Sequence, residues 1–398
     1  MSVTAARGFR AAGVCAGLKA SGKPDLAVVV NDGPLDTAAG VFTTNRVVAA
    51  PVVWSRRLLA GQEGGRPGHA RAVVLNSGSA NACTGEQGLR DTEATAACAA
   101  GLLRTEPGQV LVCSTGVIGE RIDMPVLLEG IDVAALALAD TPRAGTDAAT
   151  AIMTTDTVSK EDVLTVGTGE KGWTVGGMIK GVGMLAPGLA TMLAVITTDA
   201  VLTPREAQDA LASVTARTVN RINSDGCMST NDTVLLLASG ASGVTPSRAE
   251  FDEALTDVMG RLGRRLVADA EGATHDIAIT VSGAVSEAAA EAAARTVSSS
   301  NLLKCAVAGA DPNWGRVLSQ LGTVPEDVCP FNPDEVDVTI NGVTIFRHGA
   351  PDQDRDSVDM SPRETRIDIA LSAGQAEATV WANDLTHGYV TINADYTT

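Results

Sequence analysis

Short apolar runs alternate with helical segments along almost the whole chain of 398 residues, and this alternation restricts the possible folds more than any other feature. Leu26–Val30, Ala72–Asn76 and Val110–Ser114 are runs of strand length, whereas Asp91–Leu103 has helical spacing. An alternation of this kind that continues to the end of the chain predicts a layered α/β or α+β fold.

Local signals add detail to the pattern. Thr203-Pro204-Arg205-Glu206 combines an N-cap, a first-turn proline and a capping glutamate, and predicts a helix to about Asn220. Ser247-Arg248-Ala249-Glu250 is a second capping box, before a helix expected to end near Gly272. Asn341-Gly342 predicts a hairpin between Val336–Ile340 and Val343–Phe346. Further strands are predicted at Gly40–Thr44, Pro51–Trp54, Val163–Gly167, Trp173–Ile179, Thr233–Leu237, Asp276–Val281, Arg366–Leu371, Ala376–Ala382 and Tyr389–Asn393, and further helices at Asp123–Leu138, Asp147–Met153 and Val285–Val297. No domain boundary is evident.

Composition excludes several classes of protein. The net charge is −17, with −2 in residues 1–190 and −15 in residues 191–398, and such an acidic chain is a poor partner for nucleic acid. The chain lacks an uncharged apolar run of membrane-spanning length, and Met1–Arg10 lacks an apolar signal core, so we expect a cytoplasmic protein without a membrane partner. Seven scattered cysteines without a C-x-x-C pair argue against a disulfide framework or a zinc site.

The stretch Lys180–Ala200 (KGVGMLAPGLATMLAVITTDA) changes from a loop rich in glycine into an apolar run. Its start fits a loose G-x-G-x-x-A dinucleotide loop, but Pro187 would break the helix that such a loop requires. No G-K-[ST] follows, so a phosphate-binding P-loop is also excluded. A glycine loop that simply enters a core strand remains an alternative.

Thr191 lies at this change, where a side chain can face a cleft. A hydroxyl needs a base to act as a nucleophile, and none of the four histidines is near it in sequence. The threonine's own α-amino group has a pKa close to neutrality and could take the proton. That amine exists only if the Ala190–Thr191 peptide bond has been cleaved, which spacing alone does not establish.

This segment resembles the cleavage and nucleophile motif of the ornithine acetyltransferases, also called glutamate N-acetyltransferases (the ArgJ family). Gly188 departs from the family, whose members more often carry a larger polar residue there, and this could alter processing speed. The resemblance covers essentially the whole chain through the segments GFRAAGVCAGLKA, NSGSANACTG, STGVIG, AIMTTD, STNDTV, DAEG, DPNWGRV and DLTHGYVTINADYTT.

The resemblance implies a fold of the ArgJ and DmpA type, formed by two fragments after self-cleavage between Ala190 and Thr191. These fragments, 1–190 and 191–398, would assemble as a heterotetramer of two copies of each. Thr191 would take the acetyl group of N²-acetylornithine and pass it to glutamate in a ping-pong reaction. No cofactor or metal is expected, and the resemblance leaves acetyl-CoA open as a second acetyl donor.

Thr115 and Gly116 match the family's oxyanion hole, formed by a hydroxyl and a backbone N–H. They follow the predicted strand Val110–Ser114, which would position them, although an ordinary Thr-Gly turn would look the same. The neighbouring Cys113 could be imagined as the nucleophile, but a cysteine that ends an apolar strand is more often buried packing.

The remaining matches are substrate-binding positions. Lys180 is a suitable partner for an amino-acid carboxylate, and Thr154 matches beside it. Glu271 is predicted in the last turn of a helix capped by Gly272, where the helix dipole disfavours a carboxylate. This conflict is weak support for a role in binding the substrate's ammonium group. The last two matching positions are Asn393 and Thr398.

Two other functions remain open at this point. Related autocleaved folds include aminopeptidases, in which water replaces glutamate as acceptor and Lys180 and Glu271 would hold a peptide terminus. The chain could also be a non-catalytic protein that binds amino acids and keeps the fold.

Overall fold

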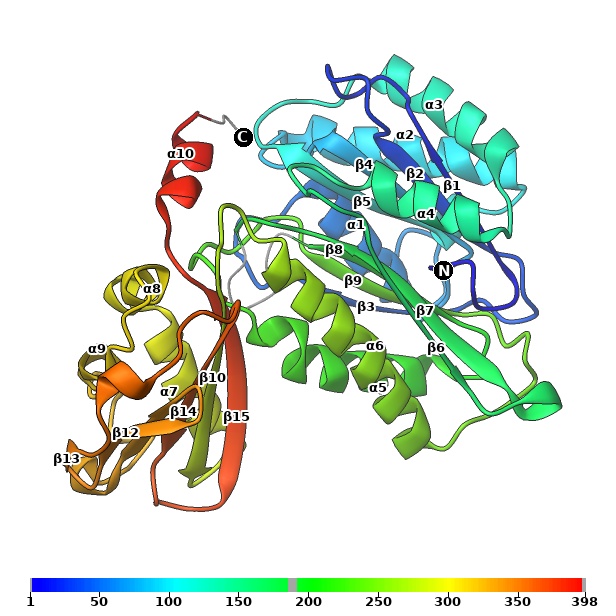
Figure 1. Ribbon diagram of the computed structural model, residues 1–398. Coiled ribbons are helices and arrows are strands. Elements are labelled where there is room, and N and C mark those ends of the chain that lie inside the picture. The colour runs from blue at the N-terminus through cyan, green and yellow to red at the C-terminus, as the bar shows by residue number, and fades with distance from the viewer. Residues whose placement is uncertain (1, 185–191, 396–398) are drawn as a thin grey trace.

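The computed structural model describes residues 2–184 and 192–395, and its mixed α/β architecture confirms the predicted fold class (Figure 1). The strands form three sheets. In spatial order, the first contains β1 (Phe9–Val14), β2 (Leu26–Asn31), β4 (Ala72–Ser79) and β5 (Val110–Val117). The second contains β3 (Thr37–Phe42), β9 (Thr233–Ala238), β8 (Leu193–Thr198), β7 (Trp173–Lys180) and β6 (Lys160–Val166). The third contains β13 (Ala350–Pro351), β12 (Val343–Arg347), β11 (Asp337–Ile340), β14 (Glu364–Ala370), β10 (Asp276–Ala284) and β15 (Ala376–Asn383).

The helices cover these sheets in groups. Those that pack with the first sheet are α1 (Ala50–Leu59), α2 (Gly85–Leu103), α3 (Met124–Ala137) and α4 (Pro142–Ala151). The second sheet is covered by α5 (Pro204–Arg217) and α6 (Arg248–Ala268), and the third by α7 (Glu287–Ser298), with α8 (Asn301–Ala308) and α9 (Trp314–Leu321) beside it (Figure 1). A last helix, α10 (His387–Asp395), stands apart from these groups. Within the described ranges, no helix is long and apolar enough to cross a membrane.

The first two sheets share a core between them. In β8, Leu193 and Val195 join the core of the first sheet, whereas Ala194 and Ile196 point the other way, toward α5 and α6. Every residue of β8 is therefore buried, which explains why its sequence is a continuous apolar run rather than an alternating one.

The third sheet has a hydrophobic core of its own, made by residues 277–382. No domain boundary before β10 was predicted from the sequence. Several hydrogen bonds connect this part to the rest of the molecule. Among them, the Asn223 backbone N–H donates to the Trp381 carbonyl at 2.8 Å, and the Asn383 side-chain amide donates to the Val267 carbonyl at 2.8 Å.

The short-range predictions are confirmed where a specific local signal carried them. Thr203 and Ser247 each accept a hydrogen bond from the backbone N–H of the glutamate three residues on, at the starts of α5 and α6. Asn341 and Gly342 both have positive φ angles, +47° and +84°, as a type I′ hairpin turn requires.

The strand predicted at Pro51–Trp54 is wrong, because these residues lie in α1. Pro51 occupies the first turn of the helix, where its missing N–H costs nothing. Val52, Ser55 and Leu58 are buried at intervals of three residues, and this helical spacing extends beyond the short window from which a strand was predicted. The strand predicted at Gly40–Thr44 exists, but begins earlier, as β3.

Two predictions near the end of the chain are also wrong. Tyr389–Asn393 lies in α10 rather than in a strand, and the Tyr389 N–H donates to the Thr386 hydroxyl at 3.2 Å, as at a helix N-cap. The helix predicted to end near Gly272 ends at Ala268, so Glu271 lies in the following turn and not in the last turn of a helix.

Candidate active site

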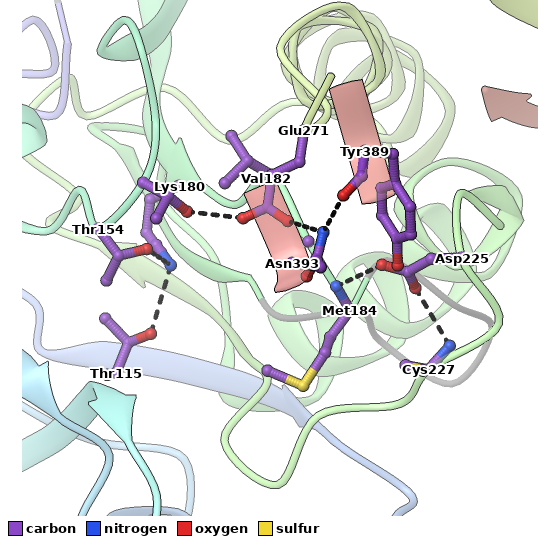
Figure 2. Close-up of a pocket in the computed structure, with 13 residues that line it drawn as sticks. Thr115, Thr154, Lys180, Val182, Met184, Asp225, Cys227, Glu271, Tyr389 and Asn393 are labelled. Carbon is purple, nitrogen blue, oxygen red and sulfur yellow. Dashed lines mark hydrogen bonds between the residues drawn. The ribbon is translucent and has the colours of Figure 1, made fainter. Parts of the chain in front are cut away.

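Segments from all parts of the chain converge on one pocket with a volume of about 160 Å³ (Figure 2). Lys180 lies on one side of it with Thr115 and Thr154, Tyr389 lies on the other with Asp225, and Glu271 lies between them. The described residues that line it are Thr115, Gly116, Thr154, Thr155, Lys180, Val182, Gly183, Met184, Asp225, Cys227, Glu271, Tyr389 and Asn393. Six of the predicted site residues are among them. The predicted residues Ala190, Thr191 and Thr398 lie outside the described residues.

Lys180 is the last residue of β7 and is only 1% exposed. Its ammonium donates to the hydroxyls of Thr154 at 2.8 Å and of Thr115 at 3.3 Å. Three predicted positions that are far apart in sequence therefore form one hydrogen-bonded group. We call this group, together with Asp156, the lysine end of the pocket.

Asp156 holds the lysine end together, and sequence reasoning assigned it no role although it ends the quoted segment AIMTTD. Its carboxylate accepts the Gly181 N–H at 2.8 Å and the Thr154 N–H at 3.0 Å, and it pairs with the buried Lys160 ammonium at 2.7 Å. Burial raises the pKa of Asp156, but the charges of Lys180 and Lys160 outweigh burial and lower it to about 2. Burial lowers the pKa of Lys180, and the charge of Asp156 opposes this.

Gly116 has to be a glycine. Its φ is +133°, and a Cβ atom there would lie 2.3 Å from the carbonyl carbon of Gly78 in the adjacent strand. The pairing of β4 with β5 is irregular at this place, and such irregularities redirect a strand end. Cys113, three residues earlier, is buried, and burial raises its pKa to about 12, which agrees with the packing role predicted for it.

Glu271 and Asn393 form the middle of the pocket. The Glu271 carboxylate accepts hydrogen bonds from the Thr155 hydroxyl and from the Asn393 side-chain amide, both at 3.0 Å. The Glu271 backbone N–H donates to the Val182 carbonyl at 3.0 Å, which fixes the turn beside the loop that follows Lys180. We call the part of the pocket that runs from Glu271 and Asn393 to Tyr389, away from Lys180, the tail end, because α10 supplies two of these three residues (Figure 2).

Asp225 and Tyr389 close the side farthest from Lys180, and sequence reasoning missed both (Figure 2). The Asp225 carboxylate accepts the backbone N–H groups of Met184 at 2.7 Å and of Cys227 at 3.1 Å. Burial nevertheless raises the pKa of Asp225, and burial also raises the pKa of Tyr389 to about 12. Asp225 precedes Gly226 and resembles any Asp-Gly turn in sequence, so no local signal could have found it.

A further buried carboxyl group, that of Asp232, contacts the backbone of Met192, the residue that follows the predicted nucleophile in sequence. Asp232 is fully buried, and it accepts the Met192 N–H at 3.0 Å. Burial raises its pKa well above the usual range, against the hydrogen bond from Met192. Asp232 lies in the quoted segment STNDTV, but sequence reasoning gave it no role.

The pocket combines a buried ammonium at one end with a carboxylate in the middle, and both are held in place by hydrogen bonds. Groups of opposite charge at fixed separation suit a small zwitterion such as an amino acid. In residues 2–184 and 192–395, no cluster of three or more His, Cys, Asp or Glu side chains could hold a metal ion. The class defined by fold and site is therefore a mixed α/β protein with a pocket for an amino acid.

Comparison with known proteins gives this class a family. Residues 10–398 match the model of the ArgJ family. A Bifidobacterium longum protein named arginine biosynthesis bifunctional protein ArgJ is 58% identical over the full length of both chains. A Streptomyces coelicolor protein of the same name is 55% identical, also over both full lengths. The chain belongs to the ArgJ family.

Solved structures also include relatives in sequence. The crystal structure of an ornithine acetyltransferase from Mycobacterium tuberculosis, complexed with ornithine, has 49% sequence identity and a TM-score of 0.44. The match covers 48% of this chain and 96% of that one.

Proposed function

We propose that this chain is an acetyltransferase of arginine biosynthesis that moves the acetyl group of N²-acetylornithine to glutamate. Membership of the ArgJ family supports the pathway and the reaction class. The observation that carries the proposal is the hydrogen-bonded group of Lys180, Thr115 and Thr154, which lies across the pocket from Glu271. A site with this charge pattern suits an amino-acid substrate better than a neutral one.

Each residue has a role in this mechanism. The Thr191 oxygen attacks the acetyl carbonyl, and Thr115 and Gly116 donate hydrogen bonds to the oxyanion that forms. The carbon–nitrogen bond then breaks, and the ornithine nitrogen receives the proton that the Thr191 amine took from the hydroxyl. Glutamate's amino nitrogen next attacks the threonine ester, the ester bond breaks, and the threonine oxygen regains a proton as N-acetylglutamate leaves.

Lys180 binds the substrate's carboxylate and Glu271 its ammonium group, with Thr154 and Asn393 holding these two charged groups in position. Thr398 completes the pocket. The chain requires cleavage between Ala190 and Thr191 to free the amine, and fragments 1–190 and 191–398 remain together as a heterotetramer in the cytoplasm. No cofactor takes part, and acetyl-CoA is a candidate second acetyl donor.

Two measurements test the proposal. Denaturing electrophoresis should resolve two fragments, and N-terminal sequencing of one should begin Thr-Met-Leu-Ala. Incubation with N²-acetylornithine and glutamate, without acetyl-CoA, should accumulate N-acetylglutamate. Free acetate instead would identify a hydrolase, and no turnover by a correctly folded, cleaved sample would leave a binding protein. An uncleaved chain with full transfer activity would refute the mechanism.

A further inference from the structure

A second cavity adjoins the pocket behind its tail end. It has a volume of about 310 Å³, and it shares Val182, Asp225, Glu271 and Tyr389 with the first. The residues that line only the second cavity include Lys304 and Asn301, which belong to the first turn of α8. Nothing in the mechanism above uses this cavity.

Lys304 is unusual in position and in composition. It is the only lysine among residues 191–398, in a part of the chain with a net charge of −15, yet it is only 5% exposed. Its ammonium donates to the backbone carbonyls of Ser224 at 2.5 Å and of Asn223 at 3.4 Å. These partners are neutral, so the charge itself is not cancelled by a contact with a carboxylate in the described residues.

The carboxylates around the second cavity are already engaged. Asp384 accepts the Thr274 N–H at 2.9 Å and pairs with His275 at 2.9 Å, and Asp225 accepts two backbone N–H groups. Lys304 and Asp225 influence one another electrostatically, and Asp225 is similarly influenced by Glu271. Glu271 and Asp225 line both cavities and Lys304 lines only the second, so a molecule that extends from the pocket into the second cavity meets two carboxylates and one ammonium group.

The proposed reaction creates an electrostatic problem that this arrangement can solve. The donor and the acceptor use one pocket in turn, but the side chain of ornithine ends in an ammonium group and that of glutamate ends in a carboxylate. Glu271 and Asp225 suit the first and would repel the second. A positive charge near the end of the bound side chain is needed for the glutamate carboxylate to bind. The positive N-terminal end of the α8 dipole would add to the attraction of such a charge for the carboxylate.

We propose that Lys304 receives the side-chain carboxylate of the acceptor and thereby gives the enzyme its preference for glutamate. This inference rests on the proposed function, since it says which residue of the same site binds the side-chain carboxylate of the acceptor. Lys304 is then a specificity-determining residue, and the second cavity is the subsite for an acidic side chain.

The test compares acceptors of different charge in the cleaved enzyme. Lys304→Met removes the charge and keeps an unbranched stem, and Lys304→Arg keeps the charge. For each variant kcat/KM is measured with glutamate and with glutamine, and the exchange of labelled ornithine with N²-acetylornithine is followed without glutamate. With Lys304→Met, we expect kcat/KM for glutamate to fall about 10- to 100-fold, the range for a lost hydrogen bond to a charged group. Glutamine turnover and ornithine exchange should change by less than about threefold, and Lys304→Arg should restore most of the glutamate activity.

A purely structural role would give another pattern. If Lys304 only holds the loop around Ser224, Lys304→Met lowers all three activities together, and the proposal is refuted while the transferase function stands. Wild-type protein that neither exchanges ornithine nor makes N-acetylglutamate would instead refute the function itself.

Asn301→Asp provides a second variant in case Lys304→Met does not fold. Asn301 is exposed at the start of α8, where an acidic residue is favourable for the helix. The added negative charge should lower glutamate turnover several-fold and leave ornithine exchange intact. Asn332→Asp, an exposed change outside both cavities, is the matched control. Equal effects of Asn301→Asp on glutamate and ornithine would overturn the proposal.

Discussion

Lys180 and Asn393 line the same pocket, yet Lys180 ends a buried strand and is 1% exposed, whereas Asn393 belongs to α10, a helix without a buried residue. The lysine end is fixed by strands, by buried ion pairs and by a chain of hydrogen bonds through Asp156. The tail end depends on a turn and on an exposed helix. We infer that the lysine end is preorganised for the reacting group, whereas the tail end contributes mainly to substrate affinity.

The largest effect should come from removing the predicted nucleophile, which would react with the group that the lysine end is proposed to orient. Thr191→Ala should remain a single chain and lose activity by at least about 10³-fold, because both the nucleophile and its cleavage site are gone. Electrophoresis and an N-acetylglutamate assay measure the two outcomes. Thr165→Ala, an exposed threonine in β6, should be cut and active as normal. Normal turnover by the Thr191 variant would assign the nucleophile elsewhere.

Asp156→Asn should weaken the lysine end without removing a group that touches substrate. The ammonium groups of Lys180 and Lys160 would lose a nearby negative charge, so the pKa of Lys180 should fall further. As the pH is raised, Lys180 would then lose its proton, and with it the substrate's carboxylate, at a lower pH than in the wild type. We expect kcat/KM for N²-acetylornithine to drop about 100-fold, with its alkaline limb shifted to lower pH. A uniform loss with an unchanged pH profile would indicate only misfolding.

The same carboxylate predicts an acid dependence of stability. The pKa of Asp156 in the folded state is about 2, below its ordinary value of 3.8. The ionised Asp156 carboxylate therefore stabilises the folded state fully above pH 3.8, and this stabilisation is lost as the pH falls toward 2. The contribution is about 2 kcal/mol. Denaturant unfolding from pH 5 to pH 2 should therefore show a steeper loss of stability for the wild type than for Asp156→Asn.

The smallest effect should come from the tail end. Asn393→Ala removes one hydrogen bond to Glu271 from an exposed side chain, so KM for N²-acetylornithine should rise by about three- to tenfold, with kcat nearly unchanged. Thr391→Ala, on the same exposed helix, should have no effect. A fall in kcat as large as that of Asp156→Asn would remove the distinction between the two ends.

The difference between the ends also explains what the sequence could predict. Apolar runs and capping signals predicted most strands and helices, because buried strands and long amphipathic helices carry periodic patterns. The site residues came from the family resemblance, since Lys180 contacts partners 26 and 65 residues away and no local pattern encodes such contacts. The helix α10 was predicted as a strand because a helix that buries no residue carries no helical period.

Asp156 and Asp225 were missed for a related reason. Each carboxylate accepts hydrogen bonds from two backbone N–H groups. In the sequence, an aspartate with this role cannot be distinguished from any other aspartate in a turn. Glu271 was predicted as a site residue partly because it was placed in the last turn of a helix. That helix, α6, ends at Ala268, so this argument was wrong. The position of Glu271 follows instead from the hydrogen bond of its backbone to Val182.

The strand order of the second sheet determines how a cleaved form of the protein would unfold and dissociate. The predicted cut lies between β7 and β8, which are hydrogen-bonded neighbours paired from Val175↔Thr198 to Lys180↔Leu193. Strands β8 and β9, from the later part of the chain, lie between β3 and β7, from the earlier part. Once cut, the protein would be a non-covalent complex whose unfolding releases two molecules. Its unfolding midpoint would then rise with protein concentration, and its refolding would follow second-order kinetics, whereas the uncut chain would show neither behaviour.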